Sequence, residues 1–377
     1  MKSSFKKVSL SLVVIIVFVL VLASCSGGNT GGGEAPAPAP APATDTDTDN
    51  GDADAVKAPV IGISTGMLGS SWRNEMATAI EDLADQYKAE GLIADYKVVN
   101  NVTGGDATEQ ANIIRDFINE GVDIILVDPN SADSLNGVLY EAVDAGITVM
   151  SFDSTLNISD IPQVTLDQYM WMNVATEMLC EMLGGSGNVI EIYGIEGHAG
   201  NVLFMEGTQA ALDKYPDVKR VASASGAWDQ VAAKEATLQI LGSGQQIDGI
   251  ITHPSMGYGC LTAFIDSNKL PKAVIGDPGT AFFKEWKKLI DEGADFQAIT
   301  MPHPPGISAT GLKIALRLYQ GKEFKDGILK DGAILYMPTT KYTNETFNDG
   351  WEAVKDQPDD YFIDEIMTDQ AADDLFK

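Results

Sequence analysis

The stretch "GVDIILVDPNSADSLNGVLYEAVDAGITVMSFDS", residues 121–154, establishes the fold class. It begins and ends with runs of apolar, largely β-branched residues, and the segment between them has helical character. Continuous apolar runs of this kind are typical of strands that are buried on both faces of a parallel sheet and connected by helices. The stretch therefore predicts a strand–helix–strand unit.

The same alternation continues through the rest of the chain from Ala58 onward. Several helices are predicted to end at glycine, as in "NEGVD", "DAGIT" and "DEGAD", because glycine readily adopts the left-handed conformation that closes a helix. The expected fold class is α/β, with parallel sheets covered on both faces. The predicted strands are "PVIGIST", "YKVVNN", "DIILVDP", "ITVMSFD", "NVIEIYG", "VKRVASAS", "GIITHP", "AVIGD", "FQAITM" and "AILYMPTT".

The unusual residues of the chain gather in the loops that follow these strands. In open parallel sheets, ligands bind beyond the carboxyl ends of the strands. Asp153 is the most informative of these residues because it ends the apolar strand "ITVMSFD". A carboxylate that is buried without partners loses several kcal/mol or more of hydration free energy. We therefore expect a ligand to supply hydrogen-bond donors to Asp153.

The composition of these loops fits a polyol ligand such as a sugar. A sugar presents hydroxyl groups along its edge and an apolar C–H face, so its site combines carboxylates and amides with aromatic rings. Charge-assisted hydrogen bonds of roughly 1.5–3 kcal/mol each would orient it. The candidates are Trp72, Arg73, Asp128, Asn130, Asp153, Trp228 and Asp277.

Structural alternatives to these roles stay open. Asp128 precedes "PNSAD" and can cap the next helix. A single tryptophan is more often part of the core than a ligand platform. A purely structural role fits Asp153 least well, although "STLN" after it can form an Asx turn.

The motifs argue against an enzyme. The chain contains no G-x-S-x-G elbow, P-loop, H-E-x-x-H or GxGxxG motif, so neither catalysis nor a cofactor is expected. His198, His253 and His303 all fall in strand-end loops, but no local spacing supports zinc ligation. We expect polar loop histidines, one or two of which face the cleft.

Length and charge restrict the function further. The 377 residues suggest about two domains. Because 25 Lys and Arg stand against 54 Asp and Glu, the net charge is −29. Such a surface is repelled by nucleic acid, which we exclude as a partner.

Residues 1–24 have the pattern of a signal peptide. Lys2, Lys6 and Lys7 precede "LSLVVIIVFVLVLA", which is shorter than the roughly 18 apolar residues that suggest a membrane span. The following "LASC", residues 22–25, resembles the lipobox of bacterial lipoproteins. That resemblance implies that Cys25 becomes the first mature residue and carries lipids that hold the protein on the outer face of the membrane. A simple transmembrane anchor is the alternative.

Residues 25–57 are predicted to be a flexible linker, because glycine, alternating Ala-Pro and an acidic Thr-Asp run cannot form a core. The other two cysteines, Cys180 and Cys260, lie on apolar helical stretches. Buried free thiols are expected there, and a disulfide remains possible in an exported protein.

Several segments, taken in order, resemble one known family. "VIGISTGMLGSSWRN", the stretch at residues 121–154, "GGSGNVIEIYGIEG", "GAWDQ" and "ALRLYQGKEF" are similar to the ribose-type, sugar-binding branch of the type I periplasmic solute-binding proteins, which serve ABC importers. The resemblance runs from about Pro59 to about Thr343. It implies two α/β lobes, each a doubly wound parallel sheet, joined by a hinge of three crossovers that closes over the ligand.

The resemblance also implies a domain division and roles for particular residues. One lobe would comprise residues 58–166 and 303–335, and the other residues 167–302 and 336–377. Trp72 falls on the first-lobe aromatic residue that packs on the sugar, with Arg73 beside it, and Asp153 on the aspartate that binds ring hydroxyls. Trp228 falls on the second-lobe aromatic residue. His253 falls where ribose-type proteins have an asparagine, and Asp277 lies within one residue of their last aspartate.

Two departures argue against a strict ribose-binding protein. Ser154 and Phe204 stand where ribose binders have arginines, which removes two forked donors. The predicted function is therefore a lipid-anchored receptor that binds a sugar or polyol and delivers it to the permease and ATPase subunits of an ABC importer. A receptor of the same fold that signals through a membrane sensor or chemoreceptor is the alternative. A transcriptional regulator is excluded, because a lipobox and an acidic tether stand where a basic helix-turn-helix would lie.

Overall fold

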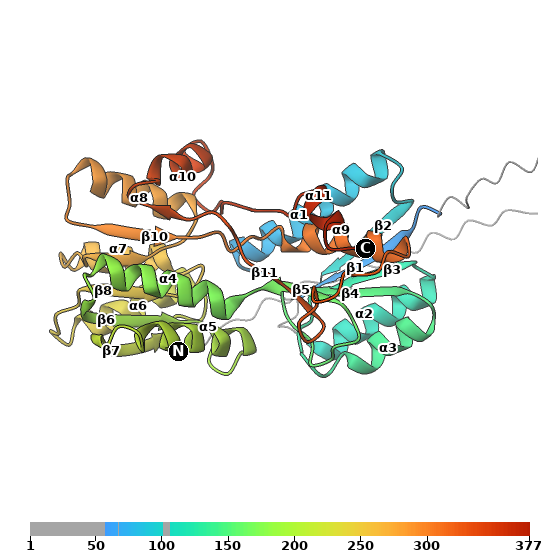
Figure 1. Ribbon diagram of the computed structural model, residues 1–377, viewed down its shortest axis with the longest axis horizontal. Helices are drawn as coiled ribbons and strands as arrows, with labels where there is room; N and C mark the ends of the chain where they lie inside the picture. The colour runs from blue at the N-terminus through green and yellow to red at the C-terminus, as the bar shows by residue number, and fades with distance from the viewer. Residues whose placement is uncertain (1–56, 67, 101–105) are drawn as a thin grey trace, which may run out of the picture. The chain divides into compact units, whose positions relative to one another are not determined.

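Two sheets organise the chain in a computed structural model, which describes residues 57–66, 68–100 and 106–377 (Figure 1). In the first sheet every strand pair is parallel. Its strands are β1 (Val60–Thr65), β2 (Asp95–Asn100), β3 (Ile124–Val127), β4 (Thr148–Phe152), β5 (Gln163–Leu166) and β11 (Ala333–Tyr336), in the order β2-β1-β3-β4-β5-β11. Helices α1 (Ser71–Ala89) and α9 (Ile307–Tyr319) cover one face, and α2 (Ala107–Glu120) and α3 (Asn136–Asp144) cover the other.

The second sheet repeats this design. Its strands are β6 (Ser186–Tyr193), β7 (Asp217–Ser225), β8 (Gly249–Thr252), β9 (Ala273–Ile275), β10 (Gln297–Thr300) and β12 (Tyr342–Thr343), in the order β7-β6-β8-β9-β10-β12. Strand β12 pairs antiparallel with β10, and the other pairs are parallel. Helices α4 (Gln168–Met182) and α5 (Ala199–Leu212) cover one face, and α6 (Gln230–Leu241), α7 (Gly257–Asp266), α8 (Thr280–Asp291) and α10 (Phe347–Val354) lie on the other. The predicted α/β fold class is confirmed.

The strand orders define where a ligand can bind. The chain passes between the sheets after β5, after β10 and after β11. In each sheet the direction of winding reverses between two neighbouring strands, β1 and β3 in the first and β6 and β8 in the second. Crevices for ligands form at the carboxyl ends of the strands at such reversal points. The two reversal points therefore mark the loops after Thr65, Val127, Tyr193 and Thr252.

Local sequence signals fix the ends of the helices. The Ser70 side chain accepts a hydrogen bond from Arg73 N–H at the start of α1, and Asp106 caps α2 in the same way. The predicted glycine endings are confirmed, because Gly121, Gly146 and Gly293 have φ values of 73°, 81° and 69°.

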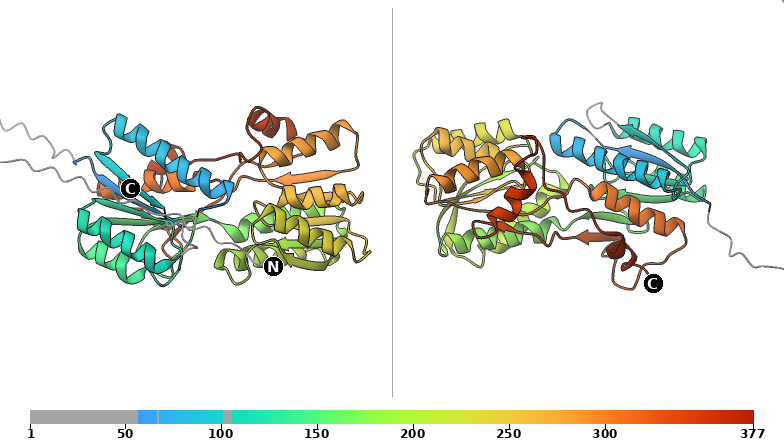
Figure 2. Two further views of the ribbon diagram at one scale, coloured as in Figure 1. Left: turned by 180° about the vertical axis from the view of Figure 1, so that it is seen from behind. Right: turned by 90° about the horizontal axis from the view of Figure 1, so that it is seen from above.

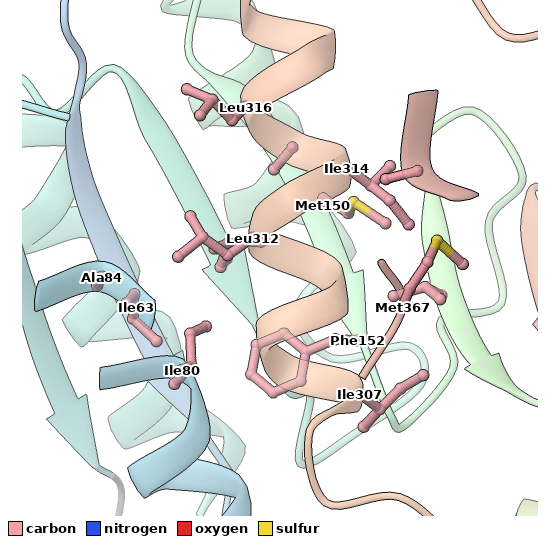
Figure 3. Packing of buried hydrophobic residues seen from close by; sticks show 14 of the residues in the cluster. Ile63, Ile80, Ala84, Met150, Phe152, Ile307, Leu312, Ile314, Leu316 and Met367 are labelled. Carbon is pink, nitrogen blue, oxygen red and sulfur yellow. The ribbon is translucent and has the colours of Figure 1, made fainter. Parts of the chain in front are cut away.

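The apolar faces of α1 and α9 form the core on one side of the first sheet. Leu312 and Ile314 of α9 belong to one core cluster with Ile80 of α1 and with Met150 and Phe152 of β4 (Figure 3). Helix α9 is buried along most of its length. It therefore fixes the first turn of α1, which carries predicted site residues, relative to the sheet.

All ten predicted strands are present, but two further strands were not predicted. Strand β5 has four residues and follows a polar loop, and β12 has only two residues. Neither "QVTL" in β5 nor "YT" in β12 forms an apolar run of the kind that marks the other strands. The structure also shows that Cys180 and Cys260 are buried free thiols rather than a disulfide.

The C-terminal tail differs from the predicted domain division. Residues 336–377 were assigned to the second lobe, but helix α11 (Asp369–Asp373) lies against α9 of the first sheet (Figure 2). Two cations of α9 hold it there: Lys313 bonds to Asp369 at 3.1 Å, and Arg317 bonds to Asp373 at 2.9 Å. The described residues from Lys57 to Lys377 belong to one compact unit.

The predicted signal peptide, Cys25 and nearly all of the predicted linker lie outside the described residues. In the part of the chain that is described, every helix is too short or too polar to cross a membrane.

Candidate functional site

A cavity of about 360 Å³ lies at the loops that follow the strands of both sheets. Its volume is at the lower end of the range of roughly 300–1,000 Å³ that is usual for small-molecule sites. The first sheet supplies the loops around residues 70–73, 129–132 and 153–155, and the second sheet supplies those around residues 197–204, 228 and 254–255. The lining residues are Ser70, Trp72, Arg73, Pro129, Asn130, Ser131, Ala132, Asp153, Ser154, Thr155, Gln168, Gly197, His198, Gly200, Phe204, Trp228, Pro254, Ser255 and His303.

Arg73 lies between two carboxylates on the first-sheet side of the cavity. Its Nη1 donates to Asp128 Oδ2 at 2.6 Å, and its Nη2 lies 3.6 Å from Asp153 Oδ2. Asp128 is almost fully buried and also accepts from Gly66 N–H at 3.2 Å. Asp128 thus aims the guanidinium at the cavity, where Arg73 and Asp153 can both meet a ligand.

Asp153 is held in a strained backbone conformation. Its φ is 60°, in the left-handed region that residues other than glycine rarely adopt. Strand β5 secures it on both sides: Asp153 N–H donates to Val164 O at 3.0 Å, and Thr165 Oγ1 donates to Asp153 O at 2.6 Å. Strand β5 therefore turns the Asp153 side chain out of the strand and into the cavity.

The charges of this wall nearly balance. Burial and the negative charge of Asp128 raise the pKa of Asp153 to about 7, although Arg73 opposes the shift. The two carboxylates raise the pKa of Arg73 above its ordinary value, against the effect of burial. Arg73 therefore stays positively charged, but Asp128 and Asp153 neutralise its charge. This wall of the cavity has no net positive charge that would attract an anionic ligand.

Trp72 forms an apolar wall together with His303. The Trp72 indole N–H donates to the His303 carbonyl oxygen at 2.6 Å, and the two ring centroids are 4.8 Å apart. Burial lowers the pKa of His303 to about 4, so its ring is neutral at physiological pH. His303 Nδ1 is buried and has no hydrogen-bond partner among the described residues, so it can bond to a ligand.

Trp228 provides the aromatic surface of the second-sheet side. Its φ is 55°, and its ring lies so close to Gly194 that a Cβ there would be 2.1 Å from the indole. The His198 ring meets it edge-on, with centroids 4.8 Å apart. Of the six described non-glycine residues with positive φ, Asp153, Trp228 and Ser255 line the cavity. Such strained residues concentrate at binding and active sites.

Phe204 closes the cavity between these two walls. It is 2% exposed, and its ring lies 6.2 Å from that of His303 and 5.2 Å from that of His253. The sequence marked this position as a departure from ribose binders. In the structure the departure makes this part of the cavity apolar.

Five of the eight residues predicted to bind ligand come together around the cavity: Trp72, Arg73, Asn130, Asp153 and Trp228. Asp128, His253 and Asp277 are not among the described residues that line it. Asp128 acts through Arg73. Asp277 is buried, and it accepts hydrogen bonds from Gln230 Nε2 at 2.8 Å and Tyr258 N–H at 2.9 Å. Its carboxylate therefore joins the starts of α6 and α7.

His253 is turned away from the cavity. It is completely buried, and its Nε2 lies 3.2 Å from the equally buried Glu191 Oε1. Glu191 also bonds to Arg220. Burial alone would raise the pKa of Glu191, but the bond to His253 and the charge of Arg220 outweigh it and lower the pKa. A buried carboxylate on the neighbouring strand thus determines where the His253 ring points.

The sequence missed several residues that line the cavity. His198 and His303 were predicted only as polar loop residues, one or two of them facing the cleft, and both line it. Gln168 was not singled out, although it begins α4 directly after the pass of the chain that follows β5. Its position beside a crossover was the available signal.

The site is suited to binding a polar, uncharged molecule. It offers one carboxylate, one forked donor, two neutral imidazoles and several hydroxyl or amide groups between aromatic walls. Within the described residues there is no group of three or more His, Cys, Asp or Glu that could hold a metal ion. Together, two α/β lobes and a cavity lined from both define a solute-binding protein.

The family comparison agrees with this class. The model of the family described as "Periplasmic binding protein domain" matches residues 61–323. The chain belongs to this family of periplasmic binding proteins. Its relatives place it in the sugar-binding branch of the type I proteins, as the sequence predicted.

The "Xylitol-binding protein" of Mycolicibacterium smegmatis is 28% identical over 232 residues, which cover 61% of this chain and 65% of that protein. The chain thus spans slightly less than two thirds of this relative. The "D-allose-binding periplasmic protein" of Escherichia coli is 26% identical over 252 residues, covering 64% of this chain and 78% of that protein. Relatives of this kind are named as binding proteins, not as enzymes.

Solved structures agree on the fold. An ABC transporter solute binding protein from Thermobispora bispora has a TM-score of 0.70 and 28% sequence identity, and the match covers 83% of this chain and 93% of that one. A galactofuranose binding protein, at 21% identity and a TM-score of 0.64, shows the shared fold alone; that match covers 80% of this chain and all of the other.

Proposed function

We propose that this protein is the extracytoplasmic receptor of an ABC importer and binds an uncharged sugar or sugar-like polyol in the cavity. The observation that carries the proposal is the pairing of Arg73 with Asp153 between the aromatic walls of Trp72 and Trp228. Arg73 would donate to ring or hydroxyl oxygens, Asp153 would accept from hydroxyl groups, and the indoles would cover the C–H faces. The names of the xylitol- and allose-binding relatives support this ligand class.

Transport would require the two lobes to move. Because the cavity is lined from both sheets, a ligand can bind one arrangement of the lobes more tightly than another, which is the condition for shifting their equilibrium. The form stabilised by ligand would then be presented to the permease, which works with the ATPase subunits. We further propose that lipidated Cys25 holds the receptor at the outer face of the cell membrane, and that the protein is not an enzyme and needs no cofactor.

The test is a tryptophan fluorescence titration with pentoses, hexoses, their derivatives, polyols and nucleosides. Trp72 and Trp228 line the cavity, so a ligand should change their emission. We expect a saturable change with one compound. Absence of any change in emission and in melting temperature across the panel would contradict a sugar or polyol ligand.

The variant Asp153→Ala provides a direct test of the site. Losing one charge-assisted hydrogen bond of roughly 1.5–3 kcal/mol should weaken binding at least tenfold, measured by calorimetry. The control is Asp160→Ala, at an exposed position outside the lining, which should leave affinity unchanged. Unchanged affinity in Asp153→Ala would remove this residue from the site.

Binding should also depend on pH. Hydroxyl donors of the ligand favour ionised Asp153, so binding lowers a pKa of about 7 and releases a proton. Affinity should rise as pH rises, and below pH 7 it should fall by up to about tenfold per pH unit. His303, with a pKa of about 4, stays neutral over this range, and burial lowers the pKa of His198 as well. Calorimetry at several pH values in two buffers measures the released proton. If affinity depended on pH in the same way in Asp153→Asn, the proton released on binding would come from another group.

A further inference from the structure

The C-terminal segment forms a fourth connection between the lobes, in addition to the three passes of the chain between the sheets. Before it, α10 lies beside α8, and Phe347 and Val354 of α10 belong to the core of the second sheet (Figure 1). After it, α11 lies against α9 of the first sheet. We name residues 359–367, between these helices, the C-terminal strap.

Backbone hydrogen bonds tie the strap to the second lobe. Thr280 N–H donates to Tyr361 O at 2.9 Å, and Ile363 N–H donates to Pro278 O at 2.8 Å. Phe362 forms an antiparallel bridge with Gly279 between these two bonds. The strap is therefore paired with the segment that leads into α8.

The same residues are bonded to the first lobe. Phe362 N–H lies 3.2 and 3.3 Å from the two carboxylate oxygens of Glu75 in α1. Gly306 N–H, at the start of α9, donates to Asp364 Oδ1 at 2.9 Å. Met367 N–H donates to Thr310 Oγ1 at 3.1 Å.

Side chains of the strap enter both cores, and those of residues 361–363 alternate between them. Phe362 and Met367 belong to the core cluster of the first sheet, whereas Ile363 belongs to that of the second and Tyr361 packs against it. Successive side chains of an extended segment point in opposite directions, so one short segment can fill both cores. The Glu365 carboxylate also accepts a hydrogen bond at 2.8 Å from Oη of Tyr336. Tyr336 ends β11, after which the chain passes to the second sheet.

The attachment points of the strap lie next to the ligand cavity in sequence. Glu75 follows Trp72 and Arg73 in the first turns of α1. Gly306 follows His303, whose carbonyl binds the Trp72 indole. The strap therefore secures the two segments that carry Trp72, Arg73 and His303.

We propose that the C-terminal strap restrains the movement of the two lobes and holds the Trp72–His303 wall in place, so that it sets the rate at which ligand leaves. Its restraint on the lobes does not depend on which ligand binds. Only its effect on release rests on the proposed function. Glu75 and Asp364 are positioning residues that act through α1 and the start of α9.

Gly306→Ala tests the restraint. Gly306 has φ −67°, which alanine tolerates, but its Cβ would lie 2.2 Å from Ile366 Cγ1 and 2.5 Å from Asp364 Oδ2. The substitution should therefore displace the strap while leaving α9 in place. Gly137→Ala is the matched control, because a Cβ there meets nothing within 4 Å.

The measurement is the distance distribution between spin labels in ligand-free protein. The labels are placed at Asp116→Cys on α2 and Glu235→Cys on α6, both exposed, in a full chain with Cys25→Ser; Cys180 and Cys260 are buried. We expect Gly306→Ala to broaden or shift the distribution and Gly137→Ala to leave it unchanged. Identical distributions in both variants would overturn the proposal, whether or not any sugar binds.

A second pair of variants keeps the test independent of folding defects at Gly306. Glu75→Gln retains an oxygen that can accept from Phe362 N–H, whereas Glu75→Ala removes it. We expect Glu75→Ala to broaden the distribution and Glu75→Gln to restore it. With a ligand from the fluorescence panel, Glu75→Ala should raise the dissociation rate at least threefold. A lower melting temperature with an unchanged distribution would show that the strap only stabilises the fold.

Discussion

Arg73→Ala should lower the free energy of unfolding by about 3 kcal/mol, because it leaves the almost fully buried Asp128 without its cation. It should also weaken ligand binding by roughly 100-fold. Loss of a charged donor accounts for about 1.5–3 kcal/mol of this effect, and a change in the protonation of Asp153 adds to it. Without Arg73, the repulsion between Asp128 and Asp153 favours protonation of Asp153, which then no longer accepts hydrogen bonds as a carboxylate.

Urea unfolding and calorimetry measure these two effects. Arg115→Ala is the matched control: Arg115 pairs with Glu141 on the surface, where an ion pair contributes about 0–1 kcal/mol. If Arg73→Ala were as stable as Arg115→Ala, Asp128 would not depend on Arg73. If it bound ligand normally, the guanidinium would not belong to the site.

His253→Ala, unlike Arg73→Ala, should lower stability while leaving ligand affinity nearly unchanged. We expect it to lower the free energy of unfolding by about 2–4 kcal/mol, because it removes a fully buried ring and one partner of Glu191. Gly194 N–H donates both to His253 Nδ1 at 3.4 Å and to Asn201 Oδ1 at 2.8 Å. Affinity should change by less than about threefold, because the bond to Asn201 remains and Gly194 still supports Trp228.

Gln168→Ala is the informative comparison for His253→Ala. Gln168 lines the cavity, so its truncation should weaken binding with little effect on urea unfolding. A tenfold loss of affinity in His253→Ala without a loss of stability would instead support the ligand contact that the sequence predicted for His253.

The fold could be predicted from the sequence because its signals are local. Apolar strand runs and glycine helix ends identify ten strands and their parallel arrangement without any knowledge of contacts. Strand β5 escaped because its four residues carry no distinctive pattern, although its bonds to Asp153 shape the site. The tail was misplaced because its partners, Lys313 and Arg317, lie on a helix more than 50 residues away.

The site could be predicted only in part, for a related reason. A position at the end of a strand tells which edge of the sheet a residue occupies, but not which way its side chain points. His253 and Asp153 both follow strands, yet a buried Glu191 draws one ring inward and a left-handed backbone turns the other side chain outward. The contact with Glu191 and the bonds from β5 that hold the backbone of Asp153 both join separate segments, so they exist only once the chain is folded.

The close fit of Trp228 over Gly194 couples the evolution of these two positions. Any side chain at position 194 would collide with the indole, so a mutation there is tolerated only after residue 228 has become smaller. A smaller residue at 228, in turn, would cost the receptor its second-lobe aromatic surface. Descendants of this protein can therefore change ligand by altering the polar first-lobe loops, while Gly194 and Trp228 remain together as an inherited pair.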